Sequence, residues 1–330
     1  MSALAPLLEA FFTERLIGQR HASPHTVGAY RDAFCLLLRF AQQHTGREPY
    51  QLSLEDLDAG LVGAFLNHLE TGRGASVRTR NARLTAIRSL FHFAAYHHPE
   101  HAAHIQRVLA IPPKRYDKRL VTYLTEEEAA ALLAAPDRST RIGRRDHALL
   151  LLALETGLRV SELTGLTCAA VQLGNGAHVR VHGKGRKERI SPLRREARAI
   201  LRAWLGERGG ASSDPLFPGP KGGQLSRDAV RRLVERHTAA ATPACPSLAA
   251  KDVTPHTLRH TCAMNLLRHG ADTATIALFL GHEDVRTTYS VYLHADLGLK
   301  EAAIAKTAPP GTRPGRYRPP DRLLAFLESL

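Results

Sequence analysis

Apolar positions over the first third of the chain recur at the three- and four-residue spacing of amphipathic helices. Three such stretches follow a serine, which can cap the free N–H groups at the start of a helix: Ser23, Ser53 and Ser76. Asp56 stands three residues after Ser53, an arrangement typical of a capping box. The apolar positions expected on that second helix are Leu57, Leu61, Phe65 and Leu69. The pattern predicts a small all-helical domain over residues 1–112.

A short basic segment follows this domain. Residues 112–119 lack apolar periodicity and contain two prolines, which resist helix formation, and four positive charges. We therefore expect an interdomain linker over residues 113–120.

Helical patterns return beyond the linker. Thr125 and Glu128 form a second capping-box pattern, and the apolar run 146–156 ends at Gly157, which can adopt the left-handed conformation of a helix C-cap. These features predict a second, larger domain over residues 121–306.

One segment of this second domain has strand periodicity instead. Residues 178–182 alternate apolar and polar positions, and the turn sequence 183–186 then leads into residues 187–192. This pattern predicts a β-hairpin with Lys184 at its tip. The fold class is therefore mainly α with a small β-hairpin or sheet (α+β), in two domains.

The end of the chain changes character again. The stretch 307–320 is rich in proline, glycine and arginine, which predicts an extended tether. Residues 321–330 place leucines and a phenylalanine on one helical stripe. We expect this helix to dock on a neighbouring protomer, although packing on its own domain is the alternative.

Composition adds an expected partner class. The formal charge is +14, from 37 arginines and 8 lysines against 31 acidic residues, and residues 113–330 carry +12 of it. A polyanion is therefore an expected partner. The four cysteines lie far apart and no long apolar run occurs, so we expect a cytoplasmic protein without a membrane span.

Several residues with chemical potential stand near predicted helix ends. Arg159 and Glu162 are three apart, so the carboxylate can orient the guanidinium. His256 and Arg259 are also three apart, directly after the helix start Thr254-Pro255. A helix N-terminus favours anions, so this second pair suits an anionic ligand.

Clustered histidines offer a metal site as an alternative. The cluster consists of His97, His98, His101 and His104. No cysteine or acidic ligand motif accompanies it. We expect neither a metal nor another cofactor.

Five motifs, in this order along the chain, resemble the tyrosine recombinase, or phage integrase, family. They are Thr156-Gly-Leu-Arg159-Val-Ser-Glu162-Leu, Gly183-Lys184-Gly185-Arg-Lys-Glu-Arg189, His256-Thr-Leu-Arg259-His260, Leu280-Gly-His282 and Tyr292-Leu-His-Ala-Asp296. The resemblance implies a two-domain clamp around double-stranded DNA, with a helical SAM-like core-binding domain and a catalytic domain.

The resemblance also implies roles for individual residues. The catalytic arginines fall on Arg159 and Arg259, the hairpin lysine on Lys184, the histidines on His256 and His282, the nucleophile on Tyr292, and a supporting acidic position on Glu162. Among basic residues outside this set, we expect DNA contacts from Lys114, Arg115, Arg186 and Lys187.

These residue types suit strand exchange without metal or ATP. Two arginines can neutralise the charge that builds on the phosphate during attack, while an ammonium such as Lys184 can protonate the leaving 5′-hydroxyl. The product would be a 3′-phosphotyrosyl link, open to attack by a second strand. Exchange between two duplexes needs several protomers, so we expect a tetramer on DNA.

The chain departs from the family in one spacing. Tyr292 follows His282 one residue later than is usual, and Tyr289 is the other candidate nucleophile. Two alternatives stay open: a type IB topoisomerase, and a DNA-binding regulator with the recombinase fold but no catalysis. Within the family, the sequence after Tyr292 is more similar to integrases of mobile elements than to chromosome-dimer resolvases.

Overall fold

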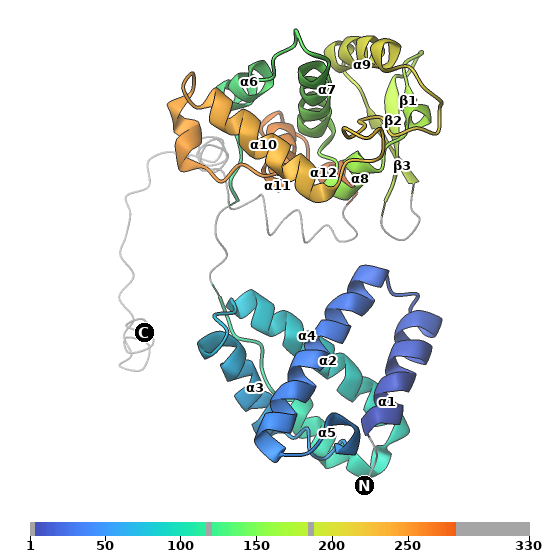
Figure 1. Cartoon of the computed structure of the whole chain (residues 1–330), viewed down its shortest axis with the longest axis vertical. Coiled ribbons are helices and arrows are strands. Elements are labelled where there is room, and N and C mark those ends of the chain that lie inside the picture. Colours follow the sequence, from blue (N-terminus) through green and yellow to red (C-terminus); the bar gives the residue numbers. More distant parts are fainter. Residues whose placement is uncertain (1–3, 117–120, 184–187, 282–330) are drawn as a thin grey trace, which may run out of the picture. The chain divides into compact units, whose positions relative to one another are not determined.

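The chain forms two compact units, Met1–Lys118 and Arg119–Leu330 (Figure 1). The computed structural model describes residues 4–116, 121–183 and 188–281. Each unit has a hydrophobic core of its own.

Unit 1 is built from helices around a phenylalanine-rich core. The helical elements are α1 (Leu4–Ala10), the π-helical segment η1 (Phe11–Gln19), α2 (Pro24–Thr45), the short η2 (Pro49–Gln51), α3 (Ala59–Thr71), α4 (Val77–His97), the short η3 (Pro99–His101) and α5 (Ala102–Leu109). Helix α4 packs against α2, α3 and α5. The rings of Phe11, Phe65 and Phe91 are fully buried among these helices.

Two of the three expected serine caps in unit 1 are confirmed. Ser23 accepts a hydrogen bond from the Thr26 backbone N–H, and Ser76 accepts one from that of Thr79, each at 3.2 Å. These bonds satisfy N–H groups that a helix leaves without partners in its first turn.

The prediction that Ser53 starts a helix is wrong. Its backbone N–H and hydroxyl both donate to Asp56, at 2.8 and 2.9 Å, within a turn, and α3 begins only after Asp58. The side chains of Leu52, Leu54 and Leu57 around this turn are all buried. Burial of these leucines in the core outweighs the local capping signal, so the capping pattern closes a turn instead of a helix.

Unit 2 is mainly helical with one small sheet (Figure 1). Its helical elements are α6 (Glu126–Ala134), α7 (Arg141–Thr156), α8 (Val160–Thr164), the short η4 (Cys168–Ala170), α9 (Arg195–Arg208), α10 (Arg227–Ala241), the short η6 (Pro246–Ala250), α11 (Pro255–Arg268) and α12 (Thr273–Leu280). In the described ranges of the two units, no helix combines the length and apolar character needed to cross a membrane.

The expected hairpin is confirmed. Strands β2 (His178–His182) and β3 (Glu188–Pro192) pair antiparallel, and Val179 and Val181 turn into the core. The sequence pattern missed β1 (Val171–Gln172), a two-residue strand that pairs with β2 and makes the sheet order β1-β2-β3. A strand this short carries too few positions to show alternation. Lys184, the expected tip, lies outside the described residues.

The helix boundaries expected in unit 2 are also confirmed. Thr125 and Glu128 form a reciprocal capping box at the start of α6. Helix α7 ends at Gly157, whose φ of 59° is left-handed, and α11 begins with Thr254 as N-cap and Pro255 in its first turn. Helices α7 and α11 pack against each other. The end of α7 therefore lies at Gly157, against α11.

Gly143→Ala should destabilise unit 2 by roughly 1–3 kcal/mol, as overpacking does. A Cβ at Gly143, in the first turn of α7, would lie 1.9 Å from the carbonyl oxygen of Asp137. The measurement is urea unfolding followed by fluorescence of Trp204, the chain's one tryptophan, which is buried in unit 2.

The matched control is Gly206→Ala in α9, where an added Cβ meets nothing within 4 Å. Alanine favours helix by up to about 1 kcal/mol over glycine, so this variant should be neutral or slightly more stable. Equal loss of stability in both variants would contradict the steric explanation.

Candidate active site

Arg259 joins the ends of two helices. The side chain is 4% exposed, and its Nη1 donates to the Gly157 carbonyl at 2.6 Å while its Nη2 donates to the Leu280 carbonyl at 2.8 Å. These carbonyls lie at the C-terminal ends of α7 and α12, where a helix lacks internal donors and carries partial negative charge. A guanidinium satisfies both needs, so Arg259 fixes α7, α11 and α12 to one another.

Arg159 reaches the same place from α8. Its Nη2 donates to the Gly281 carbonyl at 2.8 Å, and its Nη1 donates to Glu162 Oε1 at 2.9 Å. The expected Arg159–Glu162 contact is confirmed. The two residues do not share a helical face, however, because Arg159 is the extended N-cap residue (ψ 149°) before α8. Glu162 also accepts the Arg159 backbone N–H, at 2.8 Å, and so starts the helix itself.

The two arginines therefore meet at consecutive carbonyls, those of Leu280 and Gly281. The backbone at the ends of α7 and α12 requires glycine. Gly157 and Gly281 have φ of 59° and 66°, in the left-handed region that favours glycine. A Cβ at Gly157 would also lie 2.5 Å from Leu280 Cδ2. Arginines 100 positions apart in the sequence are thus brought together by two helix C-caps.

His256 lies in the first turn of α11, one turn before Arg259. Partial burial of the imidazole lowers its pKa, and the charges of Arg259 and Arg159 lower it further. The ring is therefore neutral at pH 7, the form that can accept a proton. The ring of His260 lies 6.4 Å from that of His256, centroid to centroid, and burial, followed by the charges of His256 and Arg259, lowers the His260 pKa to about 4.

Sequence reasoning assigned no role to Arg189, on β3. Its Nη1 and Nη2 donate to Glu162 Oε1 and Oε2, each at 2.9 Å, in a two-pronged ion pair. Burial would raise the pKa of Glu162, but hydrogen bonds and charge from Arg189 and Arg159 outweigh it and lower that pKa. The available signal was the alternation along β3, which places Arg189 on the same face as buried Ser191.

The other predicted site residues fall into two groups. The residues outside the described ranges are Lys184, Arg186, Lys187, His282 and Tyr292. Lys114 and Arg115 belong to unit 1, where the Lys114 ammonium pairs with Glu70 at 2.8 Å and Arg115 is exposed. The structure thus brings together Arg159, Glu162, His256 and Arg259.

The clustered histidines of unit 1 contact other groups. His98 pairs with Glu100 at 3.0 Å, His101 approaches Glu55 at 3.4 Å, and His104 hydrogen-bonds the Leu54 carbonyl at 3.0 Å. Across the described ranges, no group of three or more His, Cys, Asp or Glu side chains is arranged to hold a metal ion.

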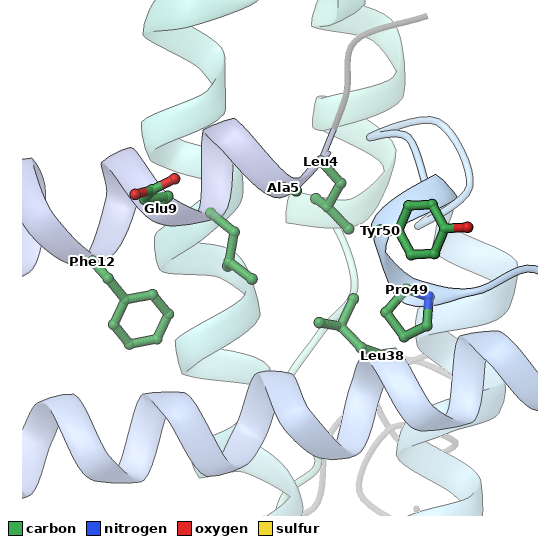
Figure 2. Close-up of a pocket in the computed structure, with 8 residues that line it drawn as sticks. Leu4, Ala5, Glu9, Phe12, Leu38, Pro49 and Tyr50 are labelled. Carbon is green, nitrogen blue, oxygen red and sulfur yellow. The ribbon is translucent and has the colours of Figure 1, made fainter.

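Unit 1 also carries an apolar groove of about 350 Å³ between α1, α2 and η2 (Figure 2). Leu4, Phe12, Leu38 and Tyr50 contribute to its walls, and Glu9 is the charged residue among its lining. None of the predicted site residues lines it.

Two family models cover most of the chain. Residues 122–297 match the phage integrase family, and residues 10–98 match the phage integrase N-terminal SAM-like domain. The chain is 54% identical over 329 residues to a protein of Sinorhizobium fredii named as an integrase/recombinase, y4rC, covering 100% of this chain and 99% of that relative. It is 36% identical over 318 residues to the tyrosine recombinase XerC of Pelobacter propionicus, covering 94% and 99%.

Solved structures share the fold. The XerH site-specific recombinase bound to difH substrate, in a pre-cleavage complex, superposes with a TM-score of 0.63 at 25% identity, covering 88% of this chain and 83% of that one. A lambda integrase dimer bound to a COC′ core site superposes with a TM-score of 0.62 at 19% identity, covering 86% and 97%. The chain belongs to the phage integrase family, and it is a tyrosine-type site-specific DNA recombinase.

Acidification should destabilise unit 2 partly through His260. Because its folded-state pKa of about 4 lies below the ordinary value of 6.5, the unfolded chain binds the extra proton between these values. Stability from this group is full above pH 6.5 and is lost as pH falls towards 4, by at most about 1.4 kcal/mol per pH unit. His260→Gln should flatten this loss in urea unfolding followed by Trp204 fluorescence at pH 7 and pH 5.

The control is His269→Gln, at the exposed end of the same helix. It removes an imidazole that is exposed to solvent and should keep the wild-type pH dependence. If His260→Gln and wild type lost equal stability between pH 7 and pH 5, the buried imidazole would not be the cause.

Proposed function

We propose that this chain cuts double-stranded DNA by attack of Tyr292 on a phosphodiester. The tyrosine oxygen forms a bond to phosphorus, the bond from phosphorus to the 5′-oxygen breaks, and a 3′-phosphotyrosyl link and a free 5′-hydroxyl result. The observation that supports this most is the convergence of Arg159 and Arg259 on the consecutive carbonyls of Leu280 and Gly281. The residue after Gly281 is His282, a further member of the proposed site.

The arginines would bind the phosphate oxygens that do not bridge to either sugar. Each guanidinium is planar and stays charged at any working pH, and fixed hydrogen bonds hold both side chains before DNA arrives. Arg159 has a third of its side chain exposed and is reachable from solvent. Arg259 lies deeper and adds positive charge beneath it.

The remaining roles concern protons. Neutral His256 is the candidate base for the tyrosine proton, since the pKa of free tyrosine is about 10 and its hydroxyl must lose a proton as it attacks. Lys184 would protonate the departing 5′-oxygen, and His282 would donate a hydrogen bond to the phosphate. The last two assignments rest on motif position.

Rejoining requires no added energy, because one phosphoester replaces another. A 5′-hydroxyl from a second duplex attacks the 3′-phosphotyrosyl link, restores the backbone and releases Tyr292 with a proton.

We propose a tetramer on DNA for this exchange, with residues 321–330 docking on a neighbouring protomer. In the same proposal, residues 1–112 and 121–306 form a clamp around DNA in the cytoplasm, and residues 113–120 and 307–320 act as linker and tether.

The names of the similar proteins support a proposal about the biological reaction. The S. fredii protein is named as an integrase/recombinase and the P. propionicus protein as XerC. Because identity to the former is higher and extends over the whole chain, we propose integration or excision of a mobile element as the biological reaction. Neither the topoisomerase nor the non-catalytic regulator gains support from these relatives.

Covalent trapping tests the nucleophile. A pool of random-sequence duplexes is first selected for binding to the full wild-type chain. The selected sequence is then rebuilt with a nick, so that the short fragment carrying the freed 5′-hydroxyl diffuses away after cleavage. Without magnesium, wild type and Tyr289→Phe should accumulate protein linked to the 3′ end, whereas Tyr292→Phe should give none. Adduct from Tyr292→Phe but not from Tyr289→Phe would move the nucleophile to Tyr289. No adduct from wild type on a site that it binds would refute strand cleavage.

Arg259→Lys should slow adduct formation by about 10²–10³-fold, because lysine cannot reach both helix ends and still present a planar fork to phosphate. The matched control is Arg202→Lys, an exposed arginine on α9 that should keep the wild-type rate. Trp204 fluorescence checks that both variants are folded. A wild-type rate for folded Arg259→Lys would contradict the role given to this arginine.

A further inference from the structure

Glu162 is shared by two guanidiniums, and this arrangement poses a charge problem. The carboxylate is buried, with 5% of its side chain exposed, and it contacts both Arg159 and Arg189. If Arg159 were its only cationic partner, the carboxylate would cancel the positive charge that a phosphate has to meet. The Arg159–Glu162 pair alone would draw the guanidinium towards the carboxylate and weaken its attraction for an anion.

Arg189 resolves this problem. It gives Glu162 a complete two-pronged partner, with both nitrogens at 2.9 Å, so the cluster of one carboxylate and two guanidiniums keeps a net charge of +1. With the Arg159 backbone N–H and Nη1, the carboxylate accepts four hydrogen bonds, about the number that its two oxygens can take. A saturated carboxylate has no spare acceptor with which to pull the Arg159 guanidinium away from the Gly281 carbonyl.

Arg189 also packs against Gly281, at the end of α12. A Cβ at Gly281 would lie 2.8 Å from its Nη1, so the guanidinium packs directly against the residue whose carbonyl holds Arg159. On β3, Arg189 is paired with buried Val181 of β2, which anchors the strand in the core. One side chain therefore connects the sheet, the start of α8 and the end of α12.

We propose that Arg189 is a positioning residue for DNA cleavage, which acts through Glu162 to keep Arg159 oriented and to keep the carboxylate from cancelling the Arg159 charge. The proposal rests on the proposed function, because it gives Arg159 the role of binding the phosphate under attack. In this proposal both terminal nitrogens of Arg189 stay on Glu162, and the side chain contacts neither the phosphate nor the reacting atoms. It should therefore affect the rate of cleavage at saturating DNA more than the affinity for DNA.

The test uses the full chain and the nicked duplex selected by wild-type binding. Arg189→Met, which keeps the stem and removes the fork and charge, should bind the duplex within about threefold of wild type. Its single-turnover rate of adduct formation at saturating DNA should fall by about 10²-fold, the lower range for loss of one oriented donor. Arg189→Lys, which keeps the charge but makes only a point contact, should recover part of that loss.

The matched control is Arg180→Met, an exposed arginine on the neighbouring strand β2. It removes the same charge from the same hairpin without touching Glu162. It should keep the wild-type rate. An equal rate loss in Arg180→Met and Arg189→Met would show a general charge effect and overturn the proposal.

A double-mutant cycle with Glu162→Gln separates positioning through Glu162 from other effects. If Arg189 acts through the carboxylate, Arg189→Met should slow Glu162→Gln by less than about threefold, because residues that act as a unit are not additive. Full additivity, or a loss confined to DNA affinity, would overturn the proposal. If Trp204 fluorescence shows that Arg189→Met does not fold, the same cycle is run with Arg189→Lys. The rate of adduct formation should then fall by a smaller factor, about tenfold.

The outcomes also distinguish this proposal from the function on which it rests. No adduct from wild type on a bound site refutes strand cleavage and leaves the role of Arg189 without a basis. Adduct from wild type with a wild-type rate for Arg189→Met refutes only the positioning role.

Discussion

The attachment of two guanidiniums to the C-terminal ends of α7 and α12 is the interaction on which the architecture of unit 2 depends. Carbonyls at these ends have no partners within their own helices, and burying them without donors would cost free energy. Arg159 and Arg259 supply the donors, at 2.6–2.8 Å. The left-handed glycines at both ends, Gly157 and Gly281, allow the chain to turn away and leave the carbonyls facing the arginines. The same bonds that fix the helices hold the arginines in place.

This arrangement concentrates positive charge. Arg159 and Arg189 share the Glu162 carboxylate, and Arg259 binds the carbonyl next to the one that Arg159 binds, so repulsion among the three guanidiniums opposes folding. The negative ends of two helix dipoles offset part of that repulsion. A site built in this way has an excess of positive charge before any anion binds, and its donors need little rearrangement when one arrives. In many enzymes, donors held in place in this way make the largest single contribution to the rate enhancement.

Local patterns in the sequence predicted the fold class, the hairpin and several helix ends. The caps at Thr125, Gly157 and Thr254 depend on residues within one helical turn, and the structure confirms them. The Ser53 cap failed because burial of Leu52, Leu54 and Leu57 in the core decided the conformation of the turn. A local signal predicts correctly where tertiary packing agrees with it, and the sequence alone does not show where packing disagrees.

The candidate site was predicted residue by residue through the family motifs, but not as a geometry. The contact between Glu162 and Arg159 spans three positions and could be expected. The contact between Glu162 and Arg189 spans 27 positions and depends on the register of β2 and β3, which no short motif encodes. Arg159 also precedes its helix, because the Glu162 carboxylate caps the helix through the Arg159 backbone N–H. Long-range partners of this kind became visible only in the structure.

The excess of positive charge also affects how readily His256, the proposed base, accepts a proton. His256 lies near the N-terminus of α11 and near two guanidiniums, so accepting a proton is unfavourable while the site is empty. In the proposed mechanism, a bound phosphate would bring negative charge beside the ring and offset part of that penalty. The imidazole would therefore become a stronger base when DNA occupies the site. Within the proposed mechanism, this links activation of the tyrosine to the presence of the phosphate that it attacks, so substrate binding and nucleophile activation depend on the same two arginines.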